Sequence, residues 1–166
     1  MRQRSIRSIV TCATGAMTLT LSSTLIAPVA NTSERVSVSQ IERGRYLVKT
    51  TGCNDCHTPG YAESAGHLAE AHWLTGNQLG WQGSWGTTYP PNLRLLMQGL
   101  SAQQWLQVAR RPMRPPMPWF ALRDMTDEDL LAIYYFARSL GPAGTTAPPF
   151  VPPGKPAQTP VVKVPG

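Results

Sequence analysis

Apolar residues recur at helical spacing in three segments of the chain, and each segment opens with a pattern that caps a helix. The first opens with Ser39-x-x-Glu42, in which both side chains can bond free backbone amides of the first turn. Gly52 is expected to end this helix. Gly44 inside it costs about 1 kcal/mol relative to Ala, which favours a close crossing with another helix. The apolar positions are Ile41 and Val48, with Leu47 beside them.

Two further helices are predicted in the second half of the chain. Ser101-x-x-Gln104 is a second capping box, and Thr126-x-x-Asp129 is a variant of the same pattern. Gly141-Pro142 follows the last helix in the order typical of a helix C-terminus. The apolar face of that helix consists of Leu130, Ile133, Tyr134, Ala137 and Leu140.

The segments between and after these helices show no sustained period. Residues 58–91 mix Gly, Ser and aromatic residues, and residues 92–100 fit a short helix or a turn. Residues 142–166 hold eight of the 16 prolines and few apolar anchors. This composition predicts an extended, polyproline-like tail that is flexible or lies along the domain, with docking to a partner as the alternative.

The first 30 residues are typical of an export signal. Arg2, Arg4 and Arg7 form a basic start, and an uncharged apolar stretch follows up to a small-residue site, Ala27-Pro28-Val29-Ala30. An uncleaved membrane anchor is the alternative, although seven Thr and Ser residues between positions 9 and 29 make the stretch a poor membrane span. We therefore predict a signal peptide at residues 1–30 and no membrane span in the mature protein unless the signal stays uncleaved.

Removing the signal changes the charge of the chain. The full sequence has 15 Lys and Arg against 9 Asp and Glu, and three of the 15 lie in the signal, which leaves 12 and a formal charge of +3. No basic patch is interleaved with aromatic residues, so a nucleic-acid partner is not indicated.

The strongest chemical signal is Cys53-Asn54-Asp55-Cys56-His57. The pattern C-x-x-C-H predicts covalent attachment of a c-type haem, because two thiols at this spacing can each add to one porphyrin vinyl group. The adjacent imidazole is then held beneath the iron and can ligate it. A structural zinc site would need a second matching pair of ligands, and a thioredoxin-type redox pair would need a βαβ context; the sequence offers neither.

A proline-rich segment, Pro112 to Phe120, offers the second axial ligand of such an iron. Proline fixes the backbone, and Met117 lies between Pro116 and Pro118, so its weakly binding thioether would be held in place beforehand. Met113 and either His67 or His72 are the alternatives, and Met97 is expected to be a core residue. In residues 58–91, Trp85 or Tyr89 could donate a hydrogen bond to a haem propionate, with core packing as the alternative.

The order of these features resembles the class I c-type cytochromes, which are single-haem electron carriers. The resemblance covers residues 40–142. Within the class, Pro116-Met117-Pro118-Trp119 and the following Met125–Leu130 segment resemble haem modules in cytochrome subunits of bacterial periplasmic dehydrogenases. Those subunits usually carry three modules, whereas this chain has one. The stretch from Asn92 to Gln98 also lacks the Thr-Pro-Asp segment that often follows such an Asn.

The resemblance implies an all-α, small class I cytochrome c fold, with three to four helices around one covalent haem, long loops and a Pro-rich C-terminal tail. The expected organisation is a signal peptide (1–30), a cytochrome c domain (31–142) and the tail (143–166). The first and last helices should cross with Gly44 against Tyr134 or Tyr135.

The resemblance also implies the site residues and the cofactor. The cofactor is one covalent haem c with its iron; Cys53 and Cys56 form the thioethers, His57 is the proximal ligand and Met117 the distal one.

The function expected from these features is that of a periplasmic electron-transfer protein rather than an enzyme. Its partners would be redox proteins, a dehydrogenase as donor or a terminal oxidase or reductase as acceptor. A basic collar of Arg110, Arg111 and Arg114 could steer an acidic partner, or these arginines could pair with propionates or with solvent. The alternatives are a ligand-binding or peroxidase-like haem protein with a labile sixth site, and a fixed electron-transfer subunit of a dehydrogenase or oxidase complex.

Overall fold

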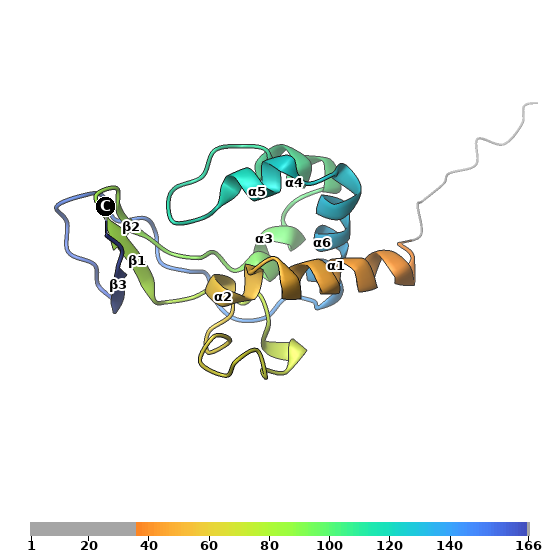
Figure 1. Ribbon diagram of the computed structural model, residues 1–166, viewed down its shortest axis with the longest axis horizontal. Helices are drawn as coiled ribbons and strands as arrows, with labels where there is room; N and C mark the ends of the chain where they lie inside the picture. Colours follow the sequence, from red (N-terminus) through yellow and green to blue (C-terminus); the bar gives the residue numbers. More distant parts are fainter. Residues whose placement is uncertain (1–35, 166) are drawn as a thin grey trace, which may run out of the picture. The chain divides into compact units, whose positions relative to one another are not determined.

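The computed structural model describes residues 36–165 (Figure 1). The predicted signal peptide, including Cys12, lies outside the described residues. The α-helices are α1 (Val38–Thr50), α2 (Cys53–His57), α3 (Leu93–Gln98), α4 (Ala102–Ala109), α5 (Trp119–Asp124) and α6 (Asp127–Ser139), with a 3-10 helix η1 (Glu70–His72). The strands are β1 (Gly80–Gly83), β2 (Gly86–Thr88) and β3 (Val161–Lys163). No helix of this part of the chain is both long and apolar enough to cross a membrane.

The first helix begins two residues before the predicted capping box. Ser37 is the N-cap, with its hydroxyl accepting from the Gln40 amide at 3.2 Å, while the Gln40 side chain accepts from the Ser37 amide at 2.9 Å. The predicted box at Ser39 and Glu42 is therefore wrong. Two overlapping patterns compete here, and the earlier one lengthens the helix and places Val36 and Ile41 at the positions of a hydrophobic staple.

The other two predicted caps are confirmed. Ser101 and Gln104 form a reciprocal capping box at the start of α4. The Thr126 hydroxyl accepts from the Asp129 amide at 3.2 Å at the start of α6, and three acidic residues follow in the first turn, where the helix dipole favours them.

The predicted close crossing occurs between α1 and α6, the two helices that pack most extensively on each other (Figure 1). A Cβ atom built on Gly44 would lie 2.0 Å from the carbonyl oxygen of Ala132 and 2.7 Å from the Cβ of Phe136. The expected contact with Tyr134 or Tyr135 is wrong. Ala132 and Phe136 are four residues apart and share one ridge of α6, and the small Ala side chain lets the backbones approach.

A small sheet and six α-helices in residues 36–165 correct the expectation of an all-α fold with three to four helices. Strands β1 and β2 form an antiparallel hairpin in which Trp81 pairs with Thr88, and β3 joins the free side of β1 in parallel, giving the order β2-β1-β3. The sheet was not predicted because β3 comes from the Pro-rich tail, about 80 positions after β1.

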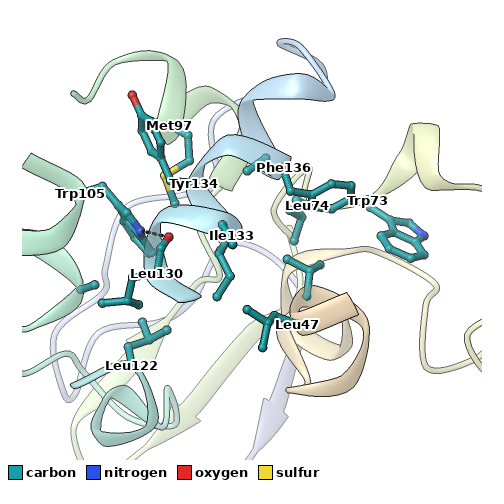
Figure 2. Packing of buried hydrophobic residues seen from close by; sticks show 14 of the residues in the cluster. Leu47, Trp73, Leu74, Met97, Trp105, Leu122, Leu130, Ile133, Tyr134 and Phe136 are labelled. Carbon is teal, nitrogen blue, oxygen red and sulfur yellow. Dashed lines mark hydrogen bonds between the residues drawn. The ribbon is translucent and has the colours of Figure 1, made fainter. Parts of the chain in front are cut away.

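The core lies between α1, α4 and α6 (Figure 2). Trp105 of α4 is buried and donates from its indole nitrogen to the Leu130 carbonyl of α6 at 2.7 Å, so a large ring is buried without an unpaired polar atom. Met97 is fully buried in the same cluster, which confirms that it is a core residue.

A buried arginine closes the end of α6. Arg94 of α3 is 5 % exposed and donates to the carbonyls of Gly141 at 2.6 Å, Ala71 at 2.7 Å and Leu140. Two of these acceptors follow the C-terminus of α6, where unpaired carbonyls and the helix dipole both favour a cation. Arg94 thus ties α3, the end of α6 and the η1 segment together.

We predict that Gly44→Ala lowers the free energy of unfolding by about 3 kcal/mol, because the added methyl group must separate α1 from α6. The measurement is denaturant unfolding of the haem-loaded protein followed by circular dichroism. Gly99→Ala is the matched control, since its Cβ would meet only carbonyl oxygens at 3.6 and 3.9 Å. Equal stability of the two variants would contradict the crossing.

We predict that Arg94→Met lowers the same free energy by about 3 kcal/mol, because it leaves buried carbonyls without donors. Arg43→Met is the matched control: Arg43 pairs with Asp129 at 2.9 Å but is largely exposed, so its removal should change little. An Arg94 variant as stable as this control would show that water replaces the lost donors.

Candidate cofactor site

The candidate site is a cavity of about 420 Å³ whose walls are mostly apolar side chains. Segments far apart in the sequence enclose it: α2, the β1–β2 hairpin, α4, and the α4–α5 loop. Ile133 of α6 closes it from the core side. The chemically reactive or polar residues among its lining include Cys53, Cys56, His57, Trp81, Thr88, Tyr89, Arg111, Met113, Arg114, Met117 and Met125.

The two predicted attachment cysteines lie on one side of a single helical turn. α2 follows Gly52, whose φ of +78° suits a residue without a side chain and lets the chain turn between α1 and α2. Cys53 and Cys56 are three positions apart in α2, so both thiols face the cavity, and neither forms a disulfide. Burial raises the pKa of both thiols above the ordinary value, which keeps them protonated at neutral pH.

His57 is buried and oriented by a single hydrogen bond. Its Nδ1 lies 2.8 Å from the carbonyl oxygen of Pro91. Because that carbonyl can only accept, Nδ1 carries the proton and Nε2 is left with a free lone pair. Burial lowers the pKa of His57, so the ring is neutral at neutral pH, as metal ligation requires. Nε2 therefore has a lone pair that is available to a metal ion.

A buried polar chain fixes the turn that carries His57. The Thr58 hydroxyl donates to the Asn54 side-chain carbonyl at 2.7 Å and accepts from the Leu74 amide at 2.8 Å. The Gly76 amide donates to the His57 carbonyl at 2.9 Å. Sequence reasoning did not identify this support. Its only local signal is an Asn and a Thr four residues apart on a short helix.

Three of the methionines line the cavity, and two of them were proposed as iron ligands from the sequence. Met117 and Met113 both lie in its lining, with Met125 beside them. The Trp119 amide donates to the Met117 carbonyl at 2.8 Å, which tightens the turn that opens α5. His67 and His72 are exposed and do not line the cavity. The structure thus brings the predicted thioether ligands to the cavity and leaves the two histidines outside.

The hairpin wall of the cavity carries polar atoms that lack partners within residues 36–165. Trp81 Nε1 and Thr88 Oγ1 are buried and make no hydrogen bond in that part of the chain. Buried polar groups are normally paired, so a ligand with hydrogen-bond acceptors fits this wall. Arg111 and Arg114 line the cavity as well. These four residues suit the carboxylate edge of a haem, and the cysteines, His57 and the apolar walls suit its remaining surface.

The predicted propionate donors are only partly placed at this wall. Tyr89 lines the cavity, and its hydroxyl oxygen accepts a hydrogen bond from Thr159 at 3.1 Å. Trp85 is not part of the lining and packs against Gly83 instead. Trp81 was not identified from the sequence, because only the pairing of β1 with β2 decides which Trp faces the cavity. In the described part of the chain, no three His, Cys, Asp or Glu side chains gather into a metal site.

Comparison with known proteins gives the family. The sequence matches the family model for cytochrome c over residues 41–141, which is more than half of the chain. No curated protein and no solved structure matches. Members of the matched family carry covalently bound haem c with its iron, serve generally as electron carriers and exchange electrons with redox partners. The cavity supplies the thiols, imidazole and apolar walls that this cofactor needs. The chain therefore belongs to the cytochrome c family.

Proposed function

We propose that this protein is a periplasmic single-haem electron carrier in which His57 and Met117 are the axial ligands of the iron. The observation that carries the proposal is the pairing of two features at one cavity: a buried imidazole with a free Nε2, and a thioether on a proline-fixed loop. A closed pair of ligands suits electron transfer, because the same ligands serve both oxidation states and little has to rearrange.

In this proposal, Cys53 and Cys56 attach the cofactor covalently. Each thiol would add its S–H across one vinyl group, so that sulfur bonds to one carbon and hydrogen to the other, with no leaving group and no oxidant. The neutral thiols favoured by burial are the form that carries this hydrogen. Both residues would then hold the cofactor beside His57, which follows Cys56 directly.

The remaining residues orient the site and exclude water. Bound haem supplies an iron that accepts one electron from a reduced partner and returns it to an oxidised one. Pro91 fixes the His57 ring through its carbonyl, and Leu122 and Ile133 keep the cavity apolar. A ligand ring held by a second hydrogen bond keeps its orientation and its basicity.

Sequence features support the proposed location and partners. The predicted signal at residues 1–30 and the need to attach haem outside the reducing cytosol both support a periplasmic location. The partners are a dehydrogenase that donates the electron or a terminal oxidase or reductase that accepts it. Such contacts between carriers and partners are small and transient.

Of the three arginines predicted to form a basic collar, one is bonded to neighbouring residues. Arg110 is engaged, donating to the Met125 carbonyl at 2.8 Å and to Asp127 at 2.5 Å. Arg111 and Arg114 are exposed at the cavity and form no ion pair with any residue between 36 and 165. These two arginines are the cations left to steer an acidic partner or to face the propionates.

We predict that the wild-type protein is low-spin in both oxidation states and ignores carbon monoxide, because Met117 closes the sixth position. Met117→Ala should give a high-spin reduced form that binds carbon monoxide. Met113→Leu is the matched control and should retain the wild-type spectrum. The measurement is the absorption spectrum of the exported protein, oxidised and reduced, with and without carbon monoxide.

Other outcomes of this experiment would indicate a different function or a different distal ligand. A wild-type reduced protein that binds carbon monoxide readily has a free sixth site, and the ligand-binding or peroxidase-like function takes the place of the carrier. A Met113→Leu variant that opens the site while Met117→Ala does not would transfer the distal role to Met113.

A further inference from the structure

The Pro-rich C-terminal segment, residues 142–165, is seated on the hairpin that forms one wall of the cavity. Val151 pairs with Thr87 of β2, with amide-to-carbonyl distances of 2.8 and 3.0 Å. Further along, the Gly80 amide donates to the Pro160 carbonyl at 3.0 Å, and β3 extends the sheet beside β1. Figure 1 shows β3, in dark blue, next to the hairpin. The tail is thus bonded to both strands that carry Trp81 and Thr88.

One glycine allows the closest approach of the tail. Gly86 has a φ of +106°, and a Cβ atom built on it would lie 2.3 Å from the Val151 carbonyl oxygen and 3.1 Å from the Phe150 ring. Only a residue without a side chain leaves room for this contact. Phe150 is therefore held at the hairpin by the backbone hydrogen bonds of Val151, the next residue, and by its close packing against Gly86.

From this position Phe150 reaches an arginine of the cavity. The guanidinium carbon of Arg114 lies 4.0 Å from the centroid of the Phe150 ring, the shortest cation–π contact among residues 36–165. Arg114 belongs to the loop that carries Met117 and also lines the cavity. No carboxylate of the described chain pairs with it. The ring of Phe150 is the contact that restricts an otherwise exposed, flexible cation.

We propose that Phe150 is a positioning residue that holds the positive charge of Arg114 beside the haem and thereby raises its reduction potential. The reduced iron carries one positive charge less than the oxidised iron, so a fixed cation nearby favours the reduced state. Net charge around a haem is one of the levers that set its potential. The proposal rests on haem binding and on the proposed carrier function, and it extends that function by giving the C-terminal tail a role in electron transfer.

An aromatic ring is required for this role, and apolar bulk alone is not sufficient. A leucine at position 150 still fills space against the hairpin, but it offers no negative π face, so Arg114 regains its rotamer freedom. A charge that moves into solvent is screened and acts more weakly on the iron. This difference separates a positioning role from a purely structural one.

The test is a spectroelectrochemical titration of the full-length, haem-loaded protein and its variants. At the wild-type midpoint potential, the ratio of oxidised to reduced protein should rise several-fold in Arg114→Gln. Phe150→Leu should shift the ratio in the same direction, and the double variant should match Arg114→Gln alone, because the ring acts through the arginine.

The controls keep the ring or remove an unrelated one. Phe150→Tyr preserves a π face, so this variant should have the wild-type ratio of oxidised to reduced protein. Phe120→Leu removes an exposed aromatic residue of α5 over whose ring no cation of residues 36–165 lies, and the ratio should not change. If Phe150→Leu does not yield haem protein, Phe150→Met serves in its place.

Three results would overturn the proposal: an unchanged ratio in Arg114→Gln, an unchanged ratio in Phe150→Leu beside a shifted Arg114→Gln, or additive effects in the double variant. Failure of the carrier function gives a different signal, namely carbon monoxide binding by the reduced wild type. The potentials can still be compared in that case, so the two failures are distinguishable.

Discussion

The contact between α1 and α6 at Gly44 is the constraint on which the rest of the structure depends. Because the Gly44 backbone meets the Ala132 carbonyl without an intervening side chain, the two 13-residue helices α1 and α6 approach each other closely at this point. α1 then leads through Gly52 into α2 and its cysteines, while α6 presents Ile133 to the cavity and Leu130 to Trp105. The crossing therefore sets where the attachment site lies relative to the opposite wall.

The site built on this crossing is arranged before any cofactor reaction. His57 is neutral, buried and held by one carbonyl, so a single nitrogen is left for a metal. The loop that carries Met117 is restricted by proline, which would hold the weakly binding thioether of the proposed second ligand in place. The donors of the hairpin wall, Trp81 and Thr88, give the cavity a polar side. In the proposed electron carrier, the fixed positions of His57 and Met117 lower the reorganisation that electron transfer requires.

The C-terminal segment is paired with the β1–β2 hairpin of the domain. Its composition predicts an extended tail, yet Val151 and β3 bond to the hairpin, and Phe150 covers Arg114. A proline-rich segment has little chain entropy to lose, so a few backbone bonds suffice to order it against an existing strand edge. The tail also covers both edges of the hairpin, with β3 beside β1 and Val151 beside β2, where amides and carbonyls would otherwise be unpaired.

The sequence by itself determined the features that are local in the chain. The C-x-x-C-H pattern, the caps at Ser101 and Thr126, the proline-framed Met117 and the small residue at Gly44 each depend on neighbours within a few positions. Only the tertiary structure decided which overlapping cap opens α1, that Gly44 faces Ala132 rather than Tyr134, and that Trp81 rather than Trp85 faces the cavity. The physical reason is that these outcomes depend on packing and strand pairing between distant segments, as between β1 and β3, and no local pattern encodes that pairing.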